Sequence, residues 1–316
     1  MKNNRRASAF SLIEISIVII IIGILVAGVT QGSRLLNQAK LSSAKTLTRS
    51  APVAGIKNLS LWIESTSDES FQSADLDDAT VITTWNDINP QTVTKANLTD
   101  STSTSTRPTY RTNIINGLPA VLFDGTDDFL STTNFSNIST AATVFAVVRF
   151  PSTISATKAI LSKRAGATSA SVNIEFGNGS TTTGWNYFDR ATAYAPTALP
   201  GDASLATSTS YVASVVYTAN SASGCGNTST GFAFFHNGAA HATTSTTCGA
   251  TTTYTPTAVS DPLFIGKQGL TTSPTFFSGH IGEIIIFDRA LKKEERQSIE
   301  TYLGKKWGIA MTVASY

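Results

Sequence analysis

The positions of hydrophobic and polar residues divide the chain into three parts with different patterns. In the first part, residues 10–29 are almost entirely apolar, and no charged residue follows Glu14 until Arg34. About 20 apolar residues in succession are enough for a helix that crosses a bilayer. This pattern predicts a membrane-spanning helix near the N-terminus.

Beyond this run, the chain keeps a weak helical periodicity as far as Pro52. A proline disfavours the helical conformation of the residue before it, so the helix is expected to end or kink there. We therefore predict one long helix over residues 10–52, of which residues 10–30 lie in the membrane and residues 31–52 form a stem. The weak apolar stripe of the stem consists of Leu36, Ala39, Ser43 and Leu47.

The second part of the chain, from Leu59 onward, alternates short runs of β-branched and aromatic residues with loops rich in Ser, Thr, Gly and Asn. Such a pattern is typical of an antiparallel sandwich or jelly roll. Asn237-Gly238 lies between two such runs and predicts a tight hairpin turn. We expect strands near residues 59–63, 81–85, 119–123, 143–150, 159–163, 171–176, 183–188, 210–218, 231–236, 263–267 and 280–288.

The third part is a short helical segment close to the C-terminus. Ile299, Leu303 and Trp307 are spaced four residues apart, so they share one face of an amphipathic helix. The predicted fold is therefore mainly β: a long N-terminal helix, an antiparallel sandwich over residues 53–316, and a short C-terminal helix packed on it.

Composition and charge narrow the functional classes. Only 14% of the residues are charged and the net charge is +2, so no strong field favours nucleic acid as a partner. The chain has two cysteines, Cys225 and Cys248, and neither is in a CxxC motif. Outside the cytoplasm these residues are expected to form one disulfide, because both lie near the open end of the 237–238 hairpin; two buried free thiols are the alternative.

Glu14 is the unusual residue of the apolar run. A carboxylate inside a membrane span costs free energy and usually has a function. A plain membrane anchor and a secretory signal peptide are two alternatives, but neither needs this carboxylate, and no A-x-A cleavage site ends the run. The basic side chains that precede the run predict that the N-terminus stays in the cytoplasm; they are Lys2, Arg5 and Arg6.

The segment from Arg5 to Glu14, with the sequence RRASAFSLIE, resembles the processing site of type IV prepilins and pseudopilins. The resemblance implies that residues 1–9 are a leader, that a prepilin peptidase cuts between Ala9 and Phe10, and that the new amino group of Phe10 is methylated. Ala9 departs from the glycine that the family usually has before the cut, and Gln31 stands where many pilins have a proline.

The same resemblance implies a role for Glu14 and a location for the chain. Cleavage leaves a cationic amine on Phe10, and Glu14 of a neighbouring subunit can pair with it in a filament, since either charge alone is costly to bury. The expected partners are the prepilin peptidase, other pilins or pseudopilins, and the membrane-embedded assembly machinery. The chain is expected in the cytoplasmic membrane, with its C-terminal domain outside, before it enters a pilus or pseudopilus at the cell surface.

Short motifs along the sandwich are similar to concanavalin A-like, laminin-G-like jelly-roll domains. This resemblance implies the fold and leaves the ligand open, since such domains include lectins, adhesive modules, glycanases and structural units. The motifs are LWI (61–63), WND (85–87), GLPAV (117–121), FDG (123–125), DD (127–128), GHIGE (279–283), FDR (287–289), YL (302–303) and KWG (306–308).

Candidate chemistry in the sandwich is sparse. Glycoside hydrolysis needs two carboxylates at a set separation, but Glu175 stands alone, and Glu283 and Asp288 fall on opposite faces of a strand. We therefore expect no enzymatic activity and no cofactor. Asp124, Asp127 and Asp128 are weak calcium candidates that more readily cap a turn. Trp185 and Tyr187 are the candidate contacts for a sugar.

These observations predict that the chain is a filament subunit whose sandwich binds a surface glycan or protein. Two alternatives stay open. The first is a type II secretion pseudopilin with a purely structural sandwich, and the second is a filament-borne glycan hydrolase.

Overall fold

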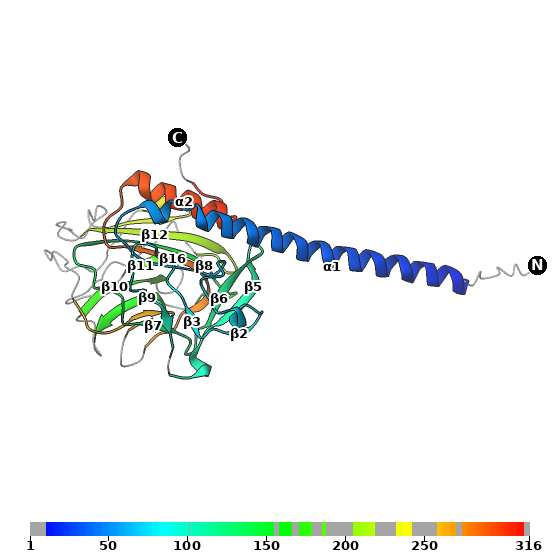
Figure 1. Cartoon of the computed structure of the whole chain (residues 1–316), viewed down its shortest axis with the longest axis horizontal. Coiled ribbons are helices and arrows are strands. Elements are labelled where there is room, and N and C mark those ends of the chain that lie inside the picture. Colours follow the sequence, from blue (N-terminus) through cyan, green and yellow to red (C-terminus); the bar gives the residue numbers. More distant parts are fainter. Residues whose placement is uncertain are drawn as a thin grey trace, which may run out of the picture.

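The computed structural model shows a long helix that leads into a β-sandwich (Figure 1). It describes residues 11–100, 102–154, 158–165, 171–178, 185–187, 205–218, 232–241, 258–269 and 274–312.

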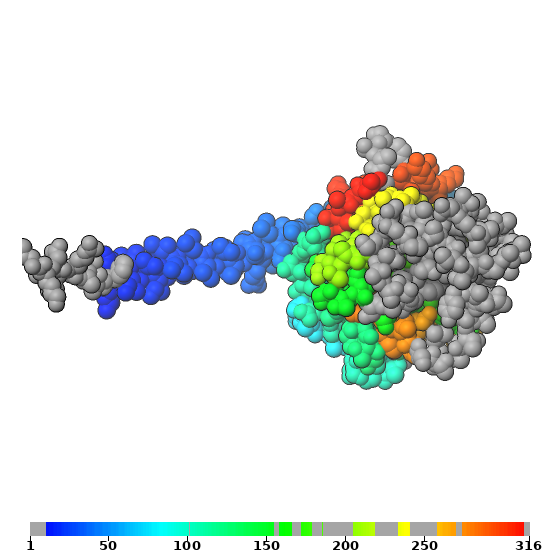
Figure 2. Space-filling view, turned by 180° about the vertical axis from the view of Figure 1, so that it is seen from behind, coloured from blue at the N-terminus to red at the C-terminus, as the bar shows by residue number. Residues whose placement is uncertain are grey.

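Helix α1 (Leu12–Arg49) is continuous over 38 residues. Ser11 caps its N-terminus, and the helix ends three residues before Pro52, which begins a short 3-10 turn, η1 (Pro52–Gly55). The structure therefore confirms the long helix and its predicted end ahead of this proline. Figure 2 shows that the first half of α1 stands clear of the sandwich.

Two antiparallel sheets form the sandwich. Among the described residues, the larger sheet contains β1 (Leu59–Glu64), β2 (Thr80–Val81), β5 (Thr109–Ile115), β6 (Leu118–Asp124), β8 (Ala141–Arg149), β12 (Ser210–Thr218), β13 (Phe232–His236), β14 (Ala239–His241) and β16 (Ser278–Phe287). The smaller sheet contains β3 (Thr84–Trp85), β4 (Leu98–Thr99), β7 (Leu130–Thr132), β9 (Lys158–Ala165), β10 (Ser171–Asn178), β11 (Trp185–Tyr187) and β15 (Leu263–Ile265).

Strand β16 organises the larger sheet. The strand order is β14-β13-β12-β8-β16-β6-β5-β2, and β1 pairs with β16 beside this path. Ile281 is aligned with Val121 of β6, whereas Ile285 is aligned with Trp62 of β1. The first and last of the described strands, β1 and β16, are therefore neighbours in one sheet.

The predicted strands are present, with one correction and several additions. The segment at 81–85 is not a single strand: β2 pairs in the larger sheet and β3 in the smaller one, so the chain crosses the sandwich between them. The sequence analysis missed β5 because its strand pattern is interrupted at Asn113, which has a φ of 58° where the register shifts. Other strands that it missed are short: β4, β7 and β14.

The hairpin predicted at Asn237-Gly238 is confirmed. These residues have φ angles of 48° and 80°, as a type I′ turn requires. The turn places His236 opposite Ala239 and Phe235 opposite Ala240. Cys225 and Cys248 lie outside the described residues, so their disulfide stays a prediction.

Apolar side chains gather in two cores. One fills the space between the sheets and includes Trp85. The other lies between the larger sheet and the helices, and it includes Trp62 and Ala44 of α1. Helix α2 (Lys293–Trp307) covers this second core with the predicted face, since Ile299, Leu303 and Trp307 are all buried.

Candidate functional site

The N-terminal half of α1 presents an apolar surface that no described residue of the chain covers. Its large apolar side chains from Leu12 to Val29 are more than half exposed, which is unfavourable in water. Within the described residues, this is the one helix that is long and apolar enough to cross a membrane. The surface needs lipid or other helices around it.

Glu14 lies in the first turn of this helix and closes a capping box. Its Oε2 accepts a hydrogen bond of 2.9 Å from the Ser11 N–H, and the Ser11 side chain accepts from the first turn in return. This arrangement satisfies backbone donors that a helix start leaves unpaired. It also holds the carboxylate at the helix N-terminus, against Ser11, the residue that follows Phe10 in the sequence. Ala9 and Phe10 themselves lie outside the described residues.

The C-terminal third of α1 is fixed to the sandwich. Ala44 and Thr48 are buried, and the Thr48 hydroxyl lies 3.5 Å from the hydroxyl of Tyr302 on α2. Lys40 donates to the backbone carbonyl of Asn116 at 3.1 Å, and Lys45 pairs with Asp68 at 2.5 Å. The stem and the sandwich are therefore joined by lateral contacts as well as by the chain.

Beneath this joint lies a buried ionic cluster that the sequence analysis missed. Glu64 of β1 and Glu283 of β16 face each other on paired strands, and Lys306 of α2 lies between them. The Lys306 Nζ is 2.8 Å from Glu64 Oε2 and 2.9 Å from Glu283 Oε2, and all three side chains are fully buried. Two like charges directly opposite in a sheet are unfavourable, so the ammonium group offsets their repulsion.

Neutral donors satisfy the remaining oxygens of the cluster. Glu283 accepts from the indole N–H groups of Trp62 and Trp307 and from the Tyr302 hydroxyl, at 2.8–2.9 Å. Burial alone would raise the pKa of Glu64, but attraction to Lys306, with hydrogen bonds from Lys306 and Thr66, lowers it. Burial alone would lower the pKa of Lys306, but the two carboxylates raise it. Glu64 and Lys306 are therefore charged near neutral pH, and the contacts of Lys306 with both glutamates hold α2 against the sheet.

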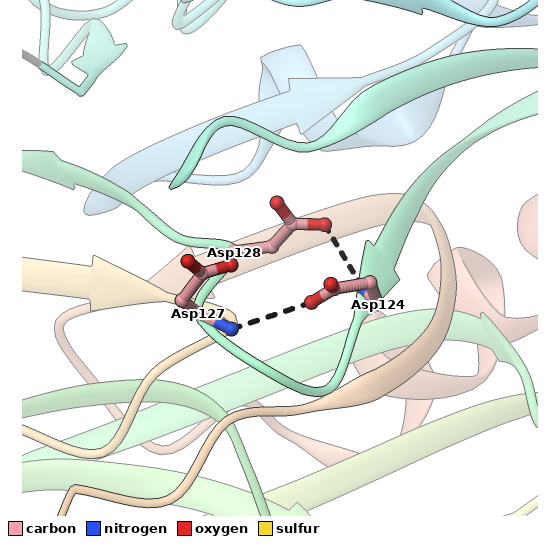
Figure 3. Close-up of side chains that lie close together, drawn as sticks. All are labelled: Asp124, Asp127 and Asp128. Atoms are coloured by element: carbon pink, nitrogen blue, oxygen red, sulfur yellow. Dashed lines mark hydrogen bonds between the residues drawn. The ribbon is translucent and has the colours of Figure 1, made fainter. Parts of the chain in front are cut away.

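The three aspartates proposed as calcium candidates do come together (Figure 3). One ligand oxygen of each lies within 4.8 Å of the others. Two of the carboxylates already bind backbone N–H groups of the same turn: Asp124 Oδ1 accepts from Thr126 and Asp127, and Asp128 Oδ2 accepts from Asp124. The geometry therefore contains the turn-capping bonds that the sequence analysis favoured, and calcium binding stays a prediction.

Asp128 makes the stability of this turn depend on pH. Burial, together with the neighbouring Asp124, Asp127 and Asp100 charges, raises its pKa to about 6 from 3.8, against the lowering effect of the Asp124 N–H. A carboxyl whose pKa is raised on folding favours the folded state below its unfolded pKa. That contribution is lost as pH rises from about 4 to about 6.

We predict that Asp128→Asn stabilises the protein at pH 7.5 by about 1–2 kcal/mol and flattens its stability between pH 4 and pH 6. The amide oxygen can still accept from the Asp124 N–H, whereas the buried charge is gone. Thermal melts across this pH range, with EDTA present, measure the effect, and Asp127→Asn is the matched control. If added calcium stabilises the wild type but not the variant, the turn is a cation site instead.

Trp185, one of the two candidate sugar contacts, is not on the surface. Its indole is 2% exposed and stacks on Phe176 with ring centroids 5.6 Å apart, and it also packs against Phe150 and Tyr211. The correction has a simple cause: β11 pairs with β10, so this residue faces the core between the sheets. The side chain of Tyr187 lies outside the described residues.

Comparisons with solved structures return chains of glycosidases. A Trypanosoma rangeli sialidase in complex with sialic acid has 11% identity and a TM-score of 0.49, over 80% of this chain and 34% of that one. Domain 4 of a GH43 extracellular arabinanase from Geobacillus stearothermophilus, in complex with arabinotriose, has 14% identity and a TM-score of 0.41. The match covers 77% of this chain and 97% of that one. An arabinofuranosidase complexed with arabinofuranosyl-α-1,2-xylobiose has 14% identity and a TM-score of 0.46. The match covers 72% of this chain and 51% of that one.

These findings contradict the expectation that the chain is not an enzyme, because the similar structures come from glycosidases. At 11–14% identity and TM-scores of 0.41–0.49, the likeness transfers no reaction or substrate. The chain spans about a third of the length of the sialidase chains that it matches. The concanavalin A-like, laminin-G-like assignment of the sandwich stays a prediction. No curated protein matches the sequence.

The N-terminus gives a more specific match. Residues 4–30 fit the family model described as the prokaryotic N-terminal methylation motif. The matched segment includes Ala9, Phe10 and Glu14 and most of the exposed apolar run of α1. This motif implies processing by a prepilin peptidase and assembly with other pilins, and with the apolar helix it indicates membrane anchoring. The chain therefore carries a type IV pilin-like N-terminal segment.

Proposed function

We propose that the chain is a type IV pilin-like filament subunit that displays a ligand-binding sandwich outside the cell. The observation that carries this proposal is the methylation motif at residues 4–30, which coincides with an exposed apolar helix that begins at a carboxylate. Residues 1–9 form the leader, residues 10–30 span the membrane, residues 31–52 form the stem, and residues 53–316 form the displayed domain.

Glu14 is the assembly residue in this proposal. Removal of the leader creates an amino group at Phe10, and that cation becomes buried when the apolar helices pack together in a filament. The Glu14 carboxylate of a neighbouring subunit neutralises it, and the pair favours one axial register, as buried polar groups do in coiled coils. The capping box supports this role because it places the carboxylate at the very start of the helix.

The sandwich is the ligand-binding domain of the proposed subunit. We assign it to the concanavalin A-like, laminin-G-like jelly rolls on the motifs it contains, and we propose that it binds a surface glycan or protein in adhesion. The rigid joint between stem and sandwich supports display, since the buried contacts of Ala44 and Thr48 hold the domain in a fixed orientation.

The processed N-terminus is the direct test of the proposal. We expect mass spectrometry of the protein purified from its native membrane or filaments to find an N-terminal, methylated Phe10. Ala9→Gly should be cut at least as fast as the wild type, because glycine is the usual residue of the family before the cut, whereas Ala9→Phe should accumulate uncut chain. A mature N-terminus beyond residue 24 would identify an ordinary signal peptide and contradict the proposal.

A further inference from the structure

A cleft of about 620 Å³ opens beside the first strand of the sandwich. Three segments line it: the start of β1 at residues 59–60, residues 92–94 and 96 of one loop, and the loop at 133–136, with Asp288 directly after β16. This volume is typical of sites that hold small ligands. The cleft is separate from Glu14, from the aspartate turn and from the ionic cluster.

Neutral polar side chains dominate the walls of the cleft. Its floor contains buried apolar residues, among them Phe135, and Asp288 is its one charged residue among the described residues that line it. The neutral polar lining residues are Ser60, Thr92, Thr94, Thr133, Asn134 and Ser136.

Two residues that line the cleft each have a buried polar atom without a partner. The Thr92 Oγ1 and the Asp288 Oδ1 make no hydrogen bond within the described part of the chain, although the Asp288 carboxylate accepts from the Ser139 backbone N–H. An unsatisfied buried polar atom costs free energy, so native proteins rarely keep one without a reason. Here two such atoms belong to residues on different walls of the same cleft. One needs a donor, and the other can donate or accept.

The walls are held in place before any ligand arrives. The side chain of Gln91 donates to the carbonyls of Ala54 and Ile56 at 3.1 and 2.7 Å, which fixes one loop to the chain that leaves the stem. The Asn134 amide donates to the Lys95 carbonyl at 3.2 Å and so joins the two loops to each other. A preformed site loses less entropy when it binds.

We propose that this cleft binds a neutral, hydroxyl-rich ligand, namely an uncharged sugar residue of a surface glycan. A sugar hydroxyl both donates and accepts, so the hydroxyl groups of a sugar suit a lining of threonine, serine and asparagine side chains with one carboxylate. An anion would meet Asp288 with no cation beside it among the described lining residues, and an apolar ligand would leave both atoms unsatisfied. The inference rests on the proposed function for its setting, since only a displayed sandwich meets surface glycans.

Sugar binding by the full-length chain in lipid nanodiscs tests the inference. Lactose, maltotriose and diacetylchitobiose serve as neutral probes, and sialyllactose and trigalacturonate serve as acidic ones, with saturation-transfer NMR and titration calorimetry as readouts. We expect at least one neutral probe to bind, and the acidic probes to bind at least tenfold more weakly than it does. If no neutral probe binds, or if the acidic probes bind equally well, the inference is overturned.

Variants locate the binding. Thr94 is an exposed lining residue, so Thr94→Trp should fill the cleft without disturbing the core and should weaken binding at least tenfold. Thr104→Trp, at an exposed position outside the lining, is the matched control and should bind like the wild type. Asp288→Ala should also weaken binding at least tenfold, with thermal melts to verify folding.

Unchanged binding by Thr94→Trp would overturn the site even if the sugar binds elsewhere. The outcome is independent of the filament assignment, because sugar binding in nanodiscs needs no assembly. Conversely, an N-terminus other than Phe10 would contradict the filament role and leave the binding result intact.

Discussion

Glu14→Gln should leave membrane insertion and cleavage after Ala9 unchanged while sharply reducing incorporation into filaments. In this structure the substitution removes the charge of Glu14 and keeps its hydrogen bond. Glutamine can also occupy the last position of a capping box, so the hydrogen bond from the Ser11 N–H and the helix start are retained. Only the negative charge is lost, which leaves the Phe10 amine of a neighbouring subunit buried without an anion.

The expected effect is large. Stranding one partner of a buried ion pair costs about 3–5 kcal/mol, and each 1.4 kcal/mol is a factor of about ten in an equilibrium. Incorporation is measured as the ratio of variant to wild-type subunit in sheared filaments from cells that express both. Ser16→Ala, which removes a neighbouring hydroxyl that bonds the Ile13 carbonyl, is the control and should assemble normally. Wild-type incorporation of the Gln variant would show that Glu14 has no role in assembly and would favour a plain anchor.

Lys306→Met should destabilise the sandwich by about 3–5 kcal/mol, because it leaves two buried carboxylates facing each other without a cation. For a domain of this size the melting temperature should fall by on the order of 10 °C. Lys305→Met is a closely matched control, since the adjacent lysine is exposed and should change stability little.

The pH dependence separates lost charge from lost packing. In the wild type the cluster stabilises the fold above the ordinary glutamate pKa of 4.5 and below the ordinary lysine pKa of 10.5, because the pKa of Glu64 is lowered and that of Lys306 is raised. In the variant, protonation of a carboxyl relieves the repulsion. The difference between the two proteins should therefore shrink as pH falls toward 4.5. A deficit that is constant with pH would mean that the lysine acts through its packing alone.

Periodicity and turn chemistry were sufficient to predict both helices, the 237–238 hairpin and most of the longer strands. The apolar run, Pro52, the 237–238 turn and the four-residue spacing of Ile299, Leu303 and Trp307 are local features, and each specifies a local conformation. The break at 81–85 was missed because one apolar stretch serves two sheets, and local pattern does not record which sheet a strand joins.

The candidate sites were harder to predict because they depend on distant pairings. Glu64 and Lys306 are 242 positions apart, and only the pairing of β1 with β16 and the packing of α2 bring them together. Trp185 is an aromatic residue of the kind that stacks on sugars at a surface, but in the paired strands β10 and β11 its side chain faces the core. By contrast, the motif at residues 4–30 is contiguous, so the sequence was enough to find it.

The lateral contacts of Lys40, Ala44, Lys45 and Thr48 prevent the sandwich from swivelling about the end of the stem. Because α1 is unbroken from Leu12 to Arg49, the face on which Glu14 lies would set the direction of the domain around the axis of the proposed filament. Each residue added between Glu14 and Lys40 would turn that direction by about 100° and raise the domain by about 1.5 Å. In the proposed filament, the length of this helix therefore sets the direction in which the proposed binding cleft of each subunit faces.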